Sequence, residues 1–372
     1  MDTLPPEPDA PVAAPDTLPP PVAPPGEAAP PRHAASLFVA LVLPLYAVLG
    51  GLAQAASPFL GLAASQLVLL VLPAILAPLG CGYRARDALL LVRRPPASAV
   101  ALGVAIGVSA FFAAGALMSL TSLAFPARWV EGFDLPRKIL DLPARERLGM
   151  WIAAATLAPL CEEVCFRGWV LTALRTRRGT GASLALSGLL FAVVHLDPIR
   201  FAAVFALGTL YAWLAWRAGS LWPAVAAHVA NNALGAALAA FAGEGDLTAA
   251  RGHVLQVVAS SSAVLAICGG VVSGLAVAYR RATPEPPAVE TALVPRDPAA
   301  PPSRFRWPRV PRAWRVSFLC GVAVLWAIAW SDAMQRGGRR GASDTAPRGT
   351  AGSRGGPGAG DAPRRAVGRP AP

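Results

Sequence analysis

The chain has 372 residues, of which 55% are hydrophobic and only 15% are charged, and its mean hydropathy is +0.50. Soluble domains carry about 25% charged residues, so this chain has too few polar groups to cover a globular surface in water. The composition indicates a membrane protein that crosses the bilayer several times, and it excludes a soluble enzyme, a disulfide scaffold and a wholly disordered chain.

The net charge of +12 comes from 33 Lys and Arg residues against 21 Asp and Glu residues. In a membrane protein an excess of arginine in cytoplasmic loops is the ordinary topology signal. The sequence has no nucleic-acid recognition motif, so we expect the bilayer and no nucleic acid as a partner. The five cysteines are odd in number and lie mostly in apolar runs, which gives no disulfide framework.

The polar ends of the chain are predicted to be disordered. Residues 1–33 are rich in proline, and residues 332–372 are rich in Gly, Arg and Pro, so neither segment can bury an apolar core. Between them we expect a transmembrane domain at 34–281, a linker rich in Pro and Arg at 282–312, and a candidate extra transmembrane helix at 313–331.

Eight hydrophobic segments are expected to cross the bilayer, which needs about 20 residues for each helix. They give an all-α bundle and lie at 34–56, 59–79, 97–124, 149–174, 182–196, 201–216, 220–241 and 254–279. A ninth candidate, at 314–330, is short and rich in Trp. The loop between the third and fourth spans has a part from Leu135 to Leu148 that is suited to lie flat at the membrane interface.

Arginines in the connections set the orientation, because cytoplasmic loops carry an excess of Lys and Arg. If the spans alternate, the arginine-rich connections all fall on one side, so that side and the amino terminus are predicted to be cytoplasmic. The residues are Arg84, Arg86, Arg93 and Arg94 after the second span, Arg175, Arg177 and Arg178 after the fourth, Arg217 after the sixth, and Arg280 with Arg281 after the eighth.

Charged residues interrupt the fourth span. An acid or an arginine at the centre of a membrane helix costs about 2.5–3.5 kcal/mol, yet this helix holds Glu162, Glu163 and Arg167. Glu163 and Arg167 are four residues apart and share a helical face, so an ion pair is predicted. Glu162 lies about 100° away around the helix and is left free for chemistry. A buried ion-pair network that only fixes packing is the alternative.

Two histidines also lie inside spans. His195 shares a helical face with Phe191, and His228 shares one with Asn232. Counted from the arginine-rich side, Glu162, His195 and His228 lie at depths of roughly 20, 25 and 17 Å. These three side chains and Asn232 are therefore predicted to meet in one cavity. Each histidine alone would also fit a helix–helix hydrogen bond. His33 and His253 lie at span ends.

These motifs occur in order on successive helices, and together they resemble the CPBP family of intramembrane proteases. That family includes the type II CAAX prenyl endopeptidases and bacterial proteins of bacteriocin processing and immunity. The resemblance covers roughly residues 150–240, including the turn from Gly219 to Pro223 before the His228 helix. It implies an intramembrane endopeptidase in which Glu162 is catalytic and Glu163 and Arg167 are the supporting pair.

The residue types suit peptide hydrolysis. Glu162 would act as base and then acid, His195 would orient the water, and His228 with Asn232 would stabilise the oxyanion. Phe191 is expected to support the site. One Glu and two His residues would also suffice for a catalytic zinc, but the His-Glu-x-x-His motif is missing, and we favour no tightly bound metal.

Other functions stay open. Cys161 and Cys165 flank the glutamates and could be thiolate ligands, although small apolar residues in a membrane helix explain them as well. Buried Glu and His also occur in proton-coupled transporters, but corresponding broken helices in two halves are missing. A non-catalytic immunity or scaffold protein of the same fold is a further alternative.

The composition is rich in Ala and Arg, with Lys138 as the sole lysine, which is typical of a high-GC bacterium. The bacterial inner membrane is therefore the expected location. The expected substrate is a membrane-associated protein or peptide.

Overall fold

The computed structural model describes residues 32–242 and 252–296, together with most positions between 320 and 331. Within these residues the protein is all-α and has no strand, apart from one isolated antiparallel bridge between Tyr83 and Pro295. The predicted tail at 332–372 lies outside the described residues, as do residues 1–31 of the predicted tail at 1–33 and residues 297–312 of the predicted linker. The division of the chain into these domains stays a prediction.

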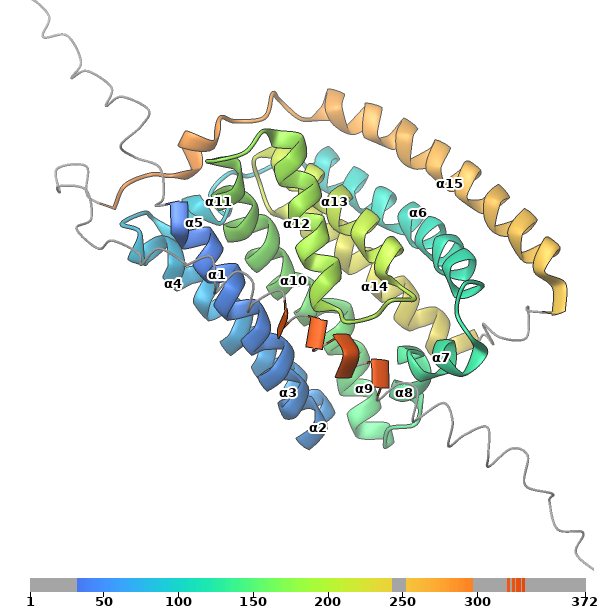
Figure 1. The fold of residues 1–372 in the computed structure, drawn as a ribbon. Helices are drawn as coiled ribbons and strands as arrows, with labels where there is room; N and C mark the ends of the chain where they lie inside the picture. The colour runs from blue at the N-terminus through green and yellow to red at the C-terminus, as the bar shows by residue number, and fades with distance from the viewer. Residues whose placement is uncertain are drawn as a thin grey trace, which may run out of the picture.

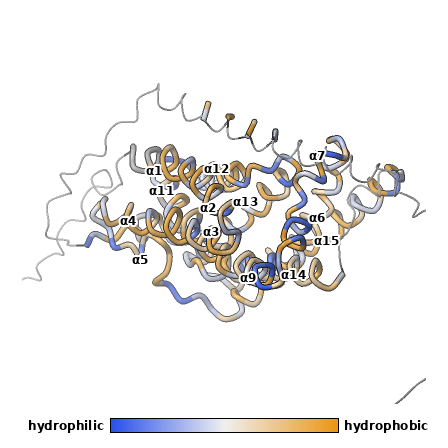
Figure 2. The backbone as a smooth tube through the Cα atoms, turned by 90° about the horizontal axis from the view of Figure 1, so that it is seen from below, coloured by the Kyte–Doolittle hydropathy of each residue, from blue (hydrophilic) through white to orange (hydrophobic). Residues whose placement is uncertain are grey.

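Seven helices are long and apolar enough to cross a membrane, which makes the chain an integral membrane protein. They are Phe38–Ala56, Pro58–Gly80, Ala97–Ser122, Ala144–Arg175, Phe201–Ala218, Trp222–Phe241 and Val254–Ala282. In Figure 2 hydrophobic positions follow these helices, and hydrophilic ones gather near α5 (Ala85–Ala88), α7 (Ala127–Gly132) and α9 (Ala144–Ile152). Seven of the eight predicted spans are thus confirmed as helices of sufficient length.

The remaining predicted span is α12 (Thr180–Val194), an apolar helix of 15 residues. Its length is about 22 Å, which is less than the ~30 Å of the hydrocarbon core. α12 packs along α13 (Phe201–Ala218) in the middle of the bundle (Figure 1). Gly188 and Gly208 bring the two helices together, since a Cβ atom on Gly208 would lie 3.0 Å from the Gly188 Cα.

π-helical turns divide three of the long helices, and each of these turns lies beside the polar centre of the bundle. The first helix consists of α1 (Arg32–Leu45), a π turn and α2 (Gly51–Ala56); the second of α3 (Pro58–Ala64), a π turn and α4 (Leu72–Gly80). The fourth contains two π turns, which separate α9, α10 (Ala158–Glu163) and α11 (Leu171–Arg175). Such turns often occur at functional sites because they redirect side chains.

The arginine-rich connections meet at one end of the bundle, at the upper left of Figure 1. Arg175 Nη2 donates to the Pro287 carbonyl at 3.0 Å, and Arg217 Nη2 donates to the Arg280 carbonyl at 3.0 Å. Ser220 Oγ donates to the Arg93 carbonyl at 2.8 Å. The predicted placement of these connections on one side is therefore confirmed.

The ninth candidate is helical at its described positions between 320 and 331, which Figure 1 shows as separate orange segments in front of the bundle. Trp326 Nε1 donates to the Val193 carbonyl at 3.1 Å, and the Trp330 ring lies 4.3 Å from that of Trp129. These contacts attach the segment to the end of α12 and to α7. That it crosses the membrane stays a prediction.

Close contact between α6 (Ala97–Ser122) and α14 (Trp222–Ala242) depends on glycine. A Cβ atom on Gly107 would lie 2.1 Å from the carbonyl oxygen of Ala227, the residue before His228. We expect Gly107→Ala to lower the stability of the folded state by about 1–3 kcal/mol, because the two backbones must separate. Thermal unfolding of the detergent-solubilised protein measures this effect. Gly115→Ala, on the same helix with no atom within 4 Å of the added Cβ, is the matched control, and equal losses in both variants would contradict the expectation.

Candidate active site

Glu163 and Arg167 form the buried ion pair that their spacing predicts. The Arg167 Nη1 atom lies 2.9 Å from Glu163 Oε1, and both side chains are fully buried. Arg167 also donates from Nη2 to the Gly208 carbonyl at 3.0 Å, and its guanidinium lies 4.3 Å from the centre of the Phe191 ring. The arginine is thus held by a carboxylate, a backbone oxygen and an aromatic face, which together offset the cost of burying it.

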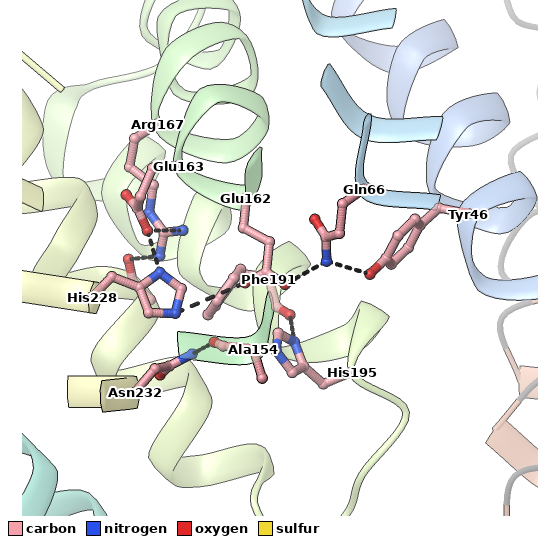
Figure 3. A network of polar contacts seen from close by, with 11 residues as sticks. Tyr46, Gln66, Ala154, Glu162, Glu163, Arg167, Phe191, His195, His228 and Asn232 are labelled. Atoms are coloured by element: carbon pink, nitrogen blue, oxygen red, sulfur yellow. Dashed lines mark hydrogen bonds and ion pairs between the residues drawn. The ribbon is translucent and has the colours of Figure 1, made fainter. Parts of the chain in front are cut away.

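His228 connects the two adjacent glutamates (Figure 3). Its Nδ1 lies 2.9 Å from Glu163 Oε1, and its Nε2 lies 3.9 Å from Glu162 Oε2. An ionised carboxylate only accepts hydrogen bonds, so Nδ1 is the donor to Glu163 and Nε2 is left to face Glu162. The imidazole stacks on the Tyr211 ring at 4.9 Å, which fixes its orientation.

His195 is the residue directly after α12, and its ring is oriented by its own helix. Its Nδ1 lies 2.6 Å from the Phe191 carbonyl oxygen, which only accepts, so Nδ1 donates and Nε2 carries the lone pair of the neutral imidazole. The turn that follows is closed by Asp197, whose Oδ1 accepts from the Arg200 backbone N–H at 3.0 Å. The Phe191 ring lies 4.6 Å from that of His195 and 5.7 Å from that of His228, and its supporting role stays a prediction.

Asn232 lies one turn beyond His228 on α14. Its Nδ2 donates to the carbonyl of Ala154 at 2.9 Å, in the π turn that precedes α10. This bond fixes the amide and leaves its second N–H for another acceptor. The adjacent Asn231 faces α6 instead, and its Nδ2 lies 3.4 Å from the Gly107 carbonyl.

One cavity of about 870 Å³ brings the predicted residues together. Its lining includes Glu162, His195, His228 and Asn232, so the predicted convergence of these four side chains is observed. The lining is otherwise mostly apolar, with a second group of charged side chains from α8 (Leu135–Leu140) and from the segments next to α8 and α12, namely Asp134, Arg137, Asp197 and Arg200. The cavity can hold a peptide segment beside the glutamate and both imidazoles.

Comparison with known families adds independent evidence. Residues 144–234 match the family model described as type II CAAX prenyl endopeptidase Rce1-like. This segment is an Rce1-like domain of the CPBP family. It runs from the start of α9 into α14 and contains all of the residues singled out in the sequence for chemistry. No curated protein and no solved structure matched the chain.

Two polar residues that line the cavity from outside the Rce1-like domain were not predicted from the sequence. Gln66 lies in the π turn between α3 and α4, and its Nε2 donates to Glu162 Oε1 at 3.1 Å. The same nitrogen lies 3.0 Å from the hydroxyl of Tyr46, at the start of the π turn after α1. Gln66 and Tyr46 are polar side chains in mostly apolar spans, and this feature of the sequence could have identified them as candidates.

A zinc site built from three protein ligands does not fit the described residues. Among them no three His, Cys, Asp or Glu side chains are arranged so that they could hold a metal ion. In the Rce1-like domain each histidine keeps Nε2 free, but Glu162, His195 and His228 are not arranged as a group of three ligands. The free thiols of Cys161 and Cys165 are buried and add no third ligand to this group.

Proposed function

We propose that the protein is an intramembrane endopeptidase that hydrolyses a peptide bond in a membrane-associated protein or peptide. The observation that carries the proposal is the shared cavity, in which Glu162 Oε2 lies 3.9 Å from His228 Nε2 with His195 and Asn232 in the same lining. Membership of residues 144–234 in a protease family supports it.

In this proposal Glu162 activates the attacking water. Its Oε1 is engaged by Gln66, so the second oxygen faces the cavity and takes the proton from water. His195 Nε2, left free by the bond from Nδ1 to Phe191, orients the same water by accepting a hydrogen bond from its other O–H, which stays intact. The hydroxide equivalent then attacks the carbonyl carbon of the substrate.

The developing oxyanion is stabilised from α14. Protonated His228 donates from Nδ1 to Glu163 and from Nε2 to the oxyanion, and the second N–H of Asn232 donates beside it. Glu162 then returns its proton to the leaving amine as the tetrahedral intermediate breaks. The Arg167–Glu163 pair holds His228 in place throughout.

The substrate can be sought in cells. We expect the membrane proteome of cells with Glu162→Ala to lack peptides that cells with the wild-type protein contain, and to retain the uncleaved precursors. Quantitative terminal proteomics on isolated membranes measures this. Loss of proton-linked uptake with unchanged peptides would instead indicate a transporter, and no change of any kind would indicate a non-catalytic scaffold.

We also propose that the arginine-rich end faces the cytoplasm of a bacterial cell, with the amino terminus on that side. Arg86 on α5 is exposed at this end. Arg128 on α7 is exposed at the opposite end, because the 26 residues of α6 separate α5 from α7 by about 39 Å.

Cysteine labelling tests this orientation in a variant without native cysteines. We expect a membrane-impermeant maleimide to label Arg128→Cys in cells whose inner membrane is intact, and to label Arg86→Cys only after that membrane is opened. The reverse pattern would overturn the orientation but would not affect the proposed chemistry.

A further inference from the structure

Gln66 is a buried amide side chain in a helix that is otherwise mostly apolar. Its side chain is 1% exposed and lies between α3 and α4 in the second long helix, where most neighbouring residues are apolar. Its Nε2 makes both of its contacts, to Glu162 Oε1 and to Tyr46 Oη (Figure 3). Its Oε1 is buried and has no hydrogen-bond partner among the described residues.

An unpartnered amide oxygen in a membrane helix is unfavourable, and Gln66 as a simple helix–helix contact would not require it. The amide is symmetric enough in shape to rotate by 180° about its last bond. In the observed orientation it donates to an ionised Glu162. After rotation the amide oxygen would face Glu162 Oε1 and would require a proton there, whereas the proposed mechanism places the proton on Oε2, so the observed donation to Oε1 suits both protonation states.

We infer that Gln66 is the positioning residue of Glu162, and that its amide N–H holds Oε1 whether or not the other oxygen carries a proton. The inference rests on the proposed function, in which Glu162 alternates between base and acid. Gln66 holds one oxygen in either state, so the other oxygen stays directed at water and at the leaving amine. Tyr46 anchors the amide and does not touch the reacting groups.

The other polar side chains described around Glu162 either face its second oxygen or are bonded elsewhere, so Gln66 is the one that holds its first oxygen. His228 Nε2 lies on the side of the other oxygen, at 3.9 Å. Glu163 and Arg167 are paired with each other, and His195 is bonded to Phe191. Among the described residues, Gln66 is the side chain that makes a hydrogen bond with Glu162 shorter than 3.5 Å.

Gln66→Met tests the inference, because methionine keeps the length and apolar packing of the side chain but cannot donate or accept as the amide does. Gln256→Met is the matched control: Gln256 lies on the exposed first turn of α15 (Val254–Ala282), away from the cavity. The first readout is the infrared spectrum of the full-length protein in lipid nanodiscs, in which the Glu162 band is the one lost in Glu162→Gln. We expect Gln66→Met to shift this band and Gln256→Met to leave it unchanged.

The second readout is the kinetics of cleavage of the peptide found by the membrane comparison above. We expect kcat to fall about 10- to 100-fold in Gln66→Met with KM within about twofold of wild type, as for loss of one hydrogen bond to a charged group. We expect a smaller fall in kcat for Tyr46→Phe, since Gln66 keeps its hydrogen bond to Glu162 in that variant. An unshifted Glu162 band in Gln66→Met overturns the inference whether or not the protein is a protease. An active Glu162→Gln variant overturns the proposed function instead, and the infrared result still decides the role of Gln66.

Discussion

Glu162→Gln is expected to lower the kcat of peptide hydrolysis by about 10²–10⁴-fold and to leave the thermal stability close to that of the wild type. The glutamine amide has nearly the shape of the carboxyl group, but it cannot take a proton from water. No arginine among the described residues pairs with Glu162, whose side chain is 12% exposed, so its charge is not needed to balance a buried arginine there. Cleavage kinetics and thermal unfolding of the purified protein measure the two effects.

The adjacent glutamate provides the control. Glu163→Gln removes the partner of the fully buried Arg167 and also the acceptor for His228 Nδ1. We expect this variant to unfold at a lower temperature, because an unpaired buried charge is costly. If both variants lost activity and stability to the same extent, the division between a reacting and a structural glutamate would be wrong.

Residue spacing predicted the contacts and shared faces of the site that lie within a single helix. The ion pair between Glu163 and Arg167 and the shared face of His228 and Asn232 follow from four-residue separations. The order of three motifs on adjacent helices was sufficient to identify the family of this segment, and the match of residues 144–234 to the Rce1-like model confirms it.

Contacts between distant helices could not be predicted in the same way. Gln66 and Glu162 are 96 positions apart, and their contact depends on how the first two long helices pack against α10. Gln66 also lies in a π turn from Ser65 to Val71, which interrupts the regular α-helix at this position. A single sequence shows neither feature.

Hydrophobic periodicity predicted that α12 exists but placed both of its ends two residues too late. The apolar run predicted a span at 182–196, and the helix is Thr180–Val194. It ends there because Leu196 adopts a φ of 50° and Pro198 follows two residues later, which together turn the chain toward α13. His195 itself keeps helical backbone angles, with φ −73° and ψ −16°, so its imidazole stays on the Phe191 face of α12 and lines the cavity.

Arg167→Met is expected to destabilise the fold by about 3–5 kcal/mol, since it leaves the fully buried Glu163 without its cation. The Gly208 carbonyl and the face of Phe191 lose their partner as well, so α10, α12 and α13 are no longer joined at one point. Thermal unfolding in detergent, together with the yield of monodisperse protein, measures the loss.

The double variant Glu163→Gln with Arg167→Met separates charge from shape. It removes both buried charges while it keeps similar side-chain volumes, and replacing a whole buried ion pair is often close to neutral. We therefore expect it to be more stable than Arg167→Met alone but still poorly active, because His228 has lost the carboxylate that fixes its Nδ1. A double variant as unstable as the single one would mean that Arg167 acts through its contacts with Gly208 and Phe191 and not through its charge. Full activity in the double variant would mean that His228 does not need Glu163 for its orientation.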